Sequence, residues 1–153
     1  MAVRKATEQD LPALIELAQR EHKELVADPG HPFGTFDVKT TRITLLAYIN
    51  HPLSEVFVSA DEVRVDGYIV CLPTQAPFNY GYKFGMDGGF YSIGAGAGRA
   101  LIAAAEEWAK GQRLAAFVVK RYYGARDRAT DVFYRRAGYA PMEVWHIKDL
   151  SEG

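Results

Sequence analysis

The spacing of apolar residues in the first third of the chain is that of two amphipathic helices. After a short strand over residues 2–6, Thr7 to Asp10 is typical of a helix N-cap with an acidic first turn, so a helix is predicted from Leu11. Its apolar positions recur at helical spacing and leave the polar side chains toward water; they are Leu11, Leu14, Ile15, Leu17 and Ala18. Residues 28–36 contain two prolines and two glycines and predict a mobile loop, and a second helix is expected over 37–49.

The middle of the chain changes to the pattern of strands. Two β-branched and aromatic runs, 55–59 and 63–72, are joined by a short acidic turn at Asp61 and Glu62, which predicts an antiparallel hairpin. Pro73 to Pro77 breaks this pattern. Residues 78–91, rich in aromatics and glycine, can supply a further strand that leads into a glycine cluster.

The last third predicts a crossover unit. A helix over 98–110 has one apolar face, and a buried strand over 114–119 follows it. A loop over 122–127, a short helix over 128–137 ended by Gly138 and a final strand over 141–147 complete the order. We therefore expect an α/β fold, mixed α+β in character, in a single domain over residues 1–153.

Composition removes several classes of function. The net charge of -1 provides no excess of positive charge that would attract nucleic acid, so a nucleic-acid-binding protein is not expected. Cys71 is the only cysteine, which excludes an internal disulfide and a cysteine-built zinc site, and it is interpreted as a small buried hydrophobe. His51 and His146 show no metal-ligand spacing, so no metal is expected. The first residues lack the apolar core of a signal peptide and no run is long enough to span a bilayer, so we expect a cytoplasmic protein without a membrane partner.

The glycine cluster at residues 94–98, directly before the alanine-rich helix, carries the strongest chemical signal. Glycine lets backbone N–H groups converge on an anion, and the first turn of a helix adds unpaired donors and a positive dipole end. The segment is therefore interpreted as a phosphate cradle. A close-packed or flexible loop is the alternative interpretation.

Three segments together resemble the GCN5-related N-acetyltransferase (GNAT) superfamily, over the whole chain. Residues 3–15 are similar to that family's first strand and helix, 93–101 to its pyrophosphate-binding motif, and 132–139 to its late Phe-Tyr-x-x-x-Gly-Phe/Tyr motif. The resemblance implies a splayed mixed β-sheet flanked by helices, with acetyl-coenzyme A in the split. It implies direct acetyl transfer to the primary amine of a small molecule or a peptide N-terminus, without a covalent enzyme intermediate.

The resemblance also implies roles for individual residues. Tyr134 falls where many members place a tyrosine beside the coenzyme A sulfur, able to protonate the departing thiolate; ordinary packing is the alternative. Asp127 stands where the family often has an asparagine that contacts the coenzyme, and Ile93 where it usually has Arg or Gln. The backbone around the cluster is expected to hold the pyrophosphate, and the coenzyme-binding residues are Ile93, Gly94, Ala95, Gly96, Ala97, Gly98 and Arg99.

The sequence identifies the general base less clearly. Asp87 is the only acidic residue between Asp66 and Glu106 and is the first candidate, with a turn role as the alternative. Weaker candidates lie on or beside the loop that tends to wall the acceptor site in this family; they are His22, Glu24 and His31. Four alternating aromatics are expected to line either an acceptor pocket or the core, namely Phe78, Tyr80, Tyr82 and Phe84.

The glycine cluster also permits comparison with other classes of phosphate-binding protein. The sequence does not match the Gly-x-Gly-x-x-Gly motif of dinucleotide-binding proteins, because Arg99 stands where the third glycine is required. It also lacks the Gly-Lys-Ser/Thr of phosphate-hydrolysing loops. A non-catalytic acyl-coenzyme A-binding protein stays open, given Ile93, Asp127 and the unclear base. The predicted final strand over 141–147 could pair at a sheet edge to form a homodimer.

Overall fold

One mixed sheet forms the centre of the protein. The computed structural model describes residues 1–27, 34–94, 96–122, 127–143 and 146. Within them the sheet has the order β1-β2-β3-β4-β5; its strands are β1 (Ala2–Lys5), β2 (Glu55–Ala60), β3 (Val65–Ala76), β4 (Asn79–Ser92) and β5 (Phe117–Val118). Neighbouring strands are antiparallel except β4 and β5, which are parallel. The predicted hairpin and the predicted crossover are therefore confirmed.

The first two long helices each follow an aspartate that accepts hydrogen bonds from nearby main-chain amides. The helices are α1 (Leu11–Val26), after the short 3-10 helix η1 (Glu8–Asp10), α2 (Val38–Asn50), α3 (Ala97–Gly111) and α4 (Asp127–Arg136). The Asp10 carboxylate accepts a hydrogen bond from the Thr7 amide and two from the Arg4 guanidinium, each at 2.8 Å. Asp37 accepts from the amide of Thr40 at 2.7 Å and caps α2. These bonds fix the entry of the chain into its first two long helices.

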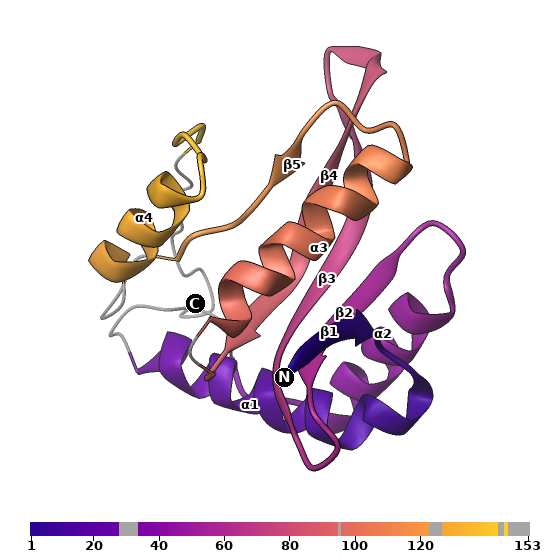
Figure 1. The fold of residues 1–153 in the computed structure, drawn as a ribbon, viewed down its shortest axis with the longest axis vertical. Helices are drawn as coiled ribbons and strands as arrows, with labels where there is room; N and C mark the ends of the chain where they lie inside the picture. The colour runs from indigo at the N-terminus through magenta and orange to yellow at the C-terminus, as the bar shows by residue number, and fades with distance from the viewer. Residues whose placement is uncertain (28–33, 95, 123–126, 144–145, 147–153) are drawn as a thin grey trace, which may run out of the picture.

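Helices cover both faces of the sheet (Figure 1). On one face, buried leucines of α1 and α2 pack with β2 and β3, through Leu14, Leu17, Leu45, Val58 and Val70. On the other, α3 and α4 contribute Leu101, Ile102, Ala105 and Tyr134 to a second cluster, which includes the fully buried Ile69 and Cys71. The period-two alternation along β3 assigns its side chains to these two faces in turn.

The hairpin of β3 and β4 is longer than the sequence indicates. Pro73 does not end β3, which continues to Ala76 with Pro73 opposite Gly85. The pair of strands projects beyond α3 at the top of Figure 1. Phe78 is 99% exposed and Tyr80 75%, so neither of these aromatics belongs to the core or to an enclosed pocket. For Phe78 and Tyr80, both interpretations of the aromatic alternation, pocket lining and core, are therefore wrong.

The C-terminal part has less strand than predicted. β5 comprises two residues in place of the expected 114–119. No strand forms at 141–143 or at 146, and the rest of the predicted final strand lies outside the described residues. Within the described chain, the edge that we expected to mediate a homodimer is therefore missing.

Candidate active site

The sheet splits between β4 and β5. The two strands pair at Gly85 with Phe117 and at Met86 with Val118, and the Gly85 amide donates to the Ala116 carbonyl at 2.8 Å. β4 then continues to Ser92, whereas the chain after β5 diverges toward α4 (Figure 1). From Asp87 onward, β4 therefore has a sheet edge that β5 does not cover.

Two side chains hold the diverging chain at Lys120. Asp87 accepts a hydrogen bond from the Lys120 amide through Oδ2 at 2.7 Å, and the Lys120 Nζ lies 3.4 Å from Oδ1. The Tyr134 hydroxyl donates to the carbonyl of the same residue at 3.1 Å. Asp87 is 2% exposed, and burial raises the pKa of its carboxyl while Lys120 lowers it. The structure thus brings the two predicted catalytic residues to the same main-chain residue, Asp87 at its amide and Tyr134 at its carbonyl.

The glycine cluster forms the start of α3, as the phosphate-cradle interpretation requires. Gly96 has φ 80°, in the left-handed region that favours glycine, and is the N-cap. The amides of Ala97 and Ala100 donate to the Gly94 and Gly96 carbonyls, and by helix geometry the first-turn amides of Gly98 and Arg99 have no acceptor within the helix. Ala95 lies outside the described residues.

Position 94 requires glycine because the side chain of Asp66 occupies the space that a Cβ would need. A Cβ built there would lie 1.9 Å from Oδ2 of Asp66, a buried carboxylate on β3. The other oxygen of Asp66 has no hydrogen-bond partner among the described residues. The Ile93 amide donates to the Asp66 carbonyl at 2.8 Å, so it is already used within the fold. Gly94 therefore makes room for a carboxylate.

Two hollows lie on opposite sides of the α3 N-terminus. The larger, about 430 Å³, faces β1 and includes Arg64 and the Asp66 carboxylate. The smaller, about 290 Å³, runs between α3 and α4 and is lined by Arg99, Arg136 and Phe133. In the first hollow Asp66 would repel a phosphate that Arg64 attracts, whereas the second has two guanidinium groups and no carboxylate among its lining residues. The second hollow also lies on the α4 side, toward which the chain diverges from β4.

The two basic residues after β5, Lys120 and Arg121, are both engaged by carboxylates. Arg121 Nε lies 3.1 Å from Oδ1 of Asp127, an ion pair that lacks hydrogen-bond alignment, and Arg121 also bonds to Asp131. Asp131 in turn accepts from Arg135 at 2.8 Å. Asp127, at the first position of α4, therefore holds Arg121 in place and stands at the favourable end of the helix dipole.

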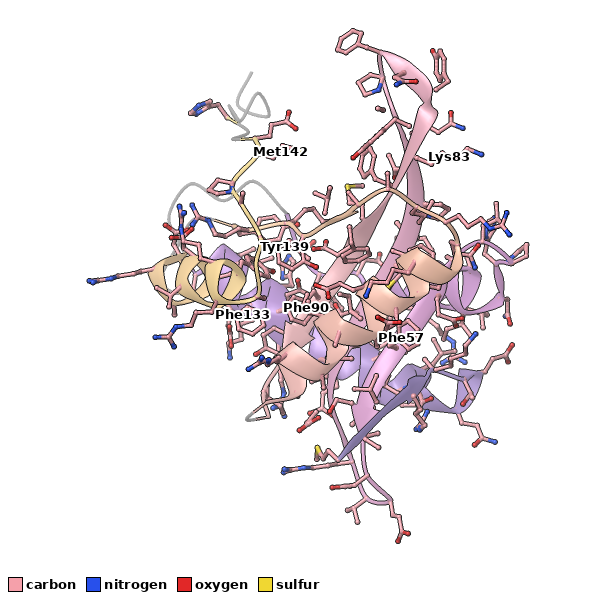
Figure 2. The ribbon with its side chains drawn as sticks, turned by 45° about the horizontal axis from the view of Figure 1, so that its top comes forward. Phe57, Lys83, Phe90, Phe133, Tyr139 and Met142 are labelled. Atoms are coloured by element: carbon pink, nitrogen blue, oxygen red, sulfur yellow. The ribbon has the colours of Figure 1, made fainter. Side chains whose placement is uncertain are left out.

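Aromatic side chains attach α4 to the rest of the site (Figure 2). The rings of Phe90 on β4 and Phe133 on α4 stack with centroids 6.5 Å apart, and Tyr134 contacts both Phe133 and Tyr139. The Tyr139 hydroxyl donates to Glu106 on α3 at 2.9 Å. Burial raises the pKa of Tyr134, so its hydroxyl keeps its proton well above neutral pH. Both alternatives for Tyr134, packing and proton donation, remain compatible with this geometry.

Comparison with known proteins decides the fold. No family model and no curated protein matches the sequence. A mutant of the BH1408 protein from Bacillus halodurans superposes with a TM-score of 0.83 at 23% identity, covering 98% of this chain and 99% of that one. A predicted acetyltransferase from Clostridium acetobutylicum, crystallised with acetyl-CoA, gives 0.74 at 14% identity over 99% and 97%. The chain has the GNAT acetyltransferase fold.

The same GNAT fold occurs in a solved structure whose protein has a stated acceptor class. An aminoglycoside acetyltransferase from an uncultured soil metagenomic sample, in complex with trehalose, gives a TM-score of 0.68 at 19% identity over 96% of this chain and 93% of that one. The splayed mixed sheet expected from the resemblance is therefore confirmed. Among the described helices, none is both long and apolar enough to cross a membrane. The described residues contain no cluster of three or more His, Cys, Asp or Glu that could hold a metal ion.

The weaker base candidates are not brought together. His22 Nε2 lies 3.1 Å from the Gly34 carbonyl and its ring contacts Phe36, while Glu24 accepts from the Tyr91 hydroxyl at 2.6 Å. His31 lies outside the described residues. Sequence reasoning missed Glu21, whose carboxylate accepts from the Tyr68 hydroxyl at 2.6 Å. The sequence does contain an indication of this buried carboxylate, because Glu21 lies seven residues after Leu14 and hence on the apolar face of α1.

Proposed function

We propose that this protein is an acetyl-CoA-dependent N-acetyltransferase that transfers an acetyl group directly to the primary amine of a small molecule or a peptide N-terminus. The observation that carries the proposal is the split itself. The uncovered edge of β4 leads directly into the N-terminus of α3. An extended amide-containing chain that ends in a pyrophosphate fits such an edge, because the strand offers main-chain hydrogen bonds and the helix offers amides and a positive dipole end.

The proposed coenzyme position uses the narrower hollow. The pyrophosphate would lie at the first-turn amides of Gly98 and Arg99, and the nucleotide would extend between α3 and α4 beside the guanidinium groups of Arg99 and Arg136. The pantetheine arm would then run along β4 past Phe90. The acetyl-CoA in the Clostridium acetobutylicum structure supports this choice of donor.

The proposed chemistry needs a neutral amine and a proton for the departing thiolate. Tyr134 stays protonated at neutral pH because burial raises its pKa, so it can supply that proton if its hydroxyl turns from the Lys120 carbonyl to the sulfur. Asp87 has both oxygens engaged by Lys120. These contacts favour a positioning role for Asp87 over the predicted role of general base.

The second candidate function is a non-catalytic acyl-CoA-binding protein of the same fold. It is favoured by the apolar side chain of Ile93 and by the use of its amide within the fold, because one phosphate contact of the family pattern is then missing. Arg121 does not replace that contact, since Asp127 and Asp131 hold it. Such a protein would bind acetyl-CoA and leave every amine unmodified.

Two measurements test the proposal in sequence. Calorimetric titration with acetyl-CoA should show saturable binding, and NAD should not bind. Thiol release is then followed with a panel of amines. We expect Tyr134→Phe to lower turnover by about 100-fold with a much smaller change in coenzyme affinity, and Tyr80→Phe at the exposed tip to match the parent. Binding without thiol release from any amine would favour the second candidate, and no binding would refute both.

A further inference from the structure

Two carboxylates on one face of α1 are each held by a tyrosine from the sheet. Glu21 accepts from the Tyr68 hydroxyl and Glu24 from the Tyr91 hydroxyl, both at 2.6 Å. Tyr68 and Tyr91 are directly opposite each other on β3 and β4. The C-terminal half of α1 therefore presents a short acidic surface to the strands that border the split.

The Tyr68 hydroxyl places Glu21 over the uncovered part of β4. A Cβ built at Gly89 would lie 3.3 Å from that hydroxyl, so no side chain separates it from the strand. Gly89 follows Asp87 by two residues, within the stretch of β4 that β5 leaves open. Glu21 thus approaches the split from the α1 face, whereas α3 and α4 cover the opposite face.

The charges around Glu21 differ from those around the other acidic residues of α1. Burial raises the pKa of its carboxyl to about 7, an effect that the Tyr68 hydrogen bond and Lys120 oppose and that Asp87 and Glu24 reinforce. Tyr122, beyond β5, interacts with the same group of charges. Glu21 keeps a part of its surface exposed, and no hydrogen bond in the described residues ends on its Oε1.

We propose that Glu21 is the general base of the reaction, and that its Oε1 takes a proton from the ammonium form of the acceptor on the α1 face of the split. The inference rests on the proposed function. An acidic surface attracts a cationic amine, and Tyr68 fixes the carboxylate while leaving one oxygen for the incoming group.

The acceptor nitrogen loses two protons in the course of the reaction. One proton moves from the ammonium nitrogen to Oε1 of Glu21 and later to water. The neutral amine then forms a C–N bond to the thioester carbonyl carbon as the C–S bond breaks. A second proton leaves the nitrogen for water, and the thiolate sulfur gains one from Tyr134 in the proposed mechanism. The Tyr134 hydroxyl is then restored by a proton from water.

The test compares pH profiles of kcat/KM for the parent protein, Glu21→Gln and Tyr68→Phe. Glu16→Gln serves as the matched control, because Glu16 is an exposed residue of the same helix that pairs only locally with Arg20. In the parent, activity should fall below a pH of about 7 as Glu21 becomes protonated. Glu21→Gln should lose this acid limb and about 100- to 1,000-fold in rate. Tyr68→Phe should move the limb to higher pH, because it removes a bond that favours the ionised form.

The outcomes separate this inference from the function on which it rests. If the parent turns over and Glu21→Gln keeps its rate and profile, the base is another group and the inference is refuted, while the acetyltransferase proposal stands. A lower rate with an unchanged acid limb would also refute it, since a purely structural role has that effect. A parent protein that binds acetyl-CoA and releases no thiol with any amine would overturn both.

Discussion

Replacing Glu21 by Gln should stabilise the protein at neutral pH and leave it unchanged in acid. Burial raises the pKa of this carboxyl from 4.5 to about 7. Between these values the folded state binds more protons than the unfolded state, so the free energy of unfolding falls as the pH rises and levels off above about 7. At about 1.4 kcal/mol per pH unit, the difference costs the native state about 3 kcal/mol.

Gln has the shape of Glu and can still accept from Tyr68, but it never carries the charge. The stability gain of Glu21→Gln should therefore grow from near zero below a pH of about 4 to about 3 kcal/mol at a pH of about 8. Asp87, whose pKa is also raised, is present in both proteins, and its repulsion of ionised Glu21 is already part of the raised pKa of Glu21.

Urea unfolding followed by circular dichroism at several pH values measures this difference. Glu16→Gln should show no such pH dependence, because Glu16 lies in solvent. A gain for Glu21→Gln that is the same at every pH would refute the reasoning, since the effect would then come from packing. If the gain does follow the titration, the protein gives up stability to keep an ionisable carboxyl at this position.

Three further substitutions test the fold and the loop. Gly94→Ala should destabilise the protein by about 2 kcal/mol or more and weaken acetyl-CoA binding, and Asp66→Ala should partly rescue it; additive effects would argue against their contact. Leu14→Ala, at a fully buried position, should cost about 2–5 kcal/mol in chemical denaturation, against almost nothing for Leu53→Ala on the surface. Asp10→Asn should cost about 1–3 kcal/mol near neutral pH. Because Arg4 lowers the pKa of Asp10, this cost should disappear in strong acid, and a persistent cost would contradict the charge-based account.

Periodicity predicted the helices well because their apolar faces contact the sheet directly. Leu11, Leu14 and Leu17 are buried as expected from their spacing. Pro73 misled the prediction of β3 for a physical reason. Pairing with β2 ends at Cys71, so from Leu72 onward β3 has an open side on which the missing N–H of a proline costs no hydrogen bond.

The candidate site could be predicted only in part. The glycine cluster and Tyr134 follow from local motifs, and the structure brings Tyr134 to Asp87 through Lys120. The role of Glu21 depends on a tyrosine 47 positions away, a contact that no local pattern contains. Two-residue β5 was predicted too long because an apolar run alone does not reveal where its partner strand diverges.

The chain that diverges from β4 is held at Lys120 by side chains, and this affects which substitutions can alter the sheet opening. In a regular sheet, hydrogen bonds between main chains fix the spacing of two strands whatever their side chains are. Here the main chain of Lys120 is tied through the side chains of Asp87 and Tyr134. The width of the opening therefore depends on which side chains stand at positions 87 and 134. Substitutions at these two positions can change that width while the rest of the sheet keeps its register.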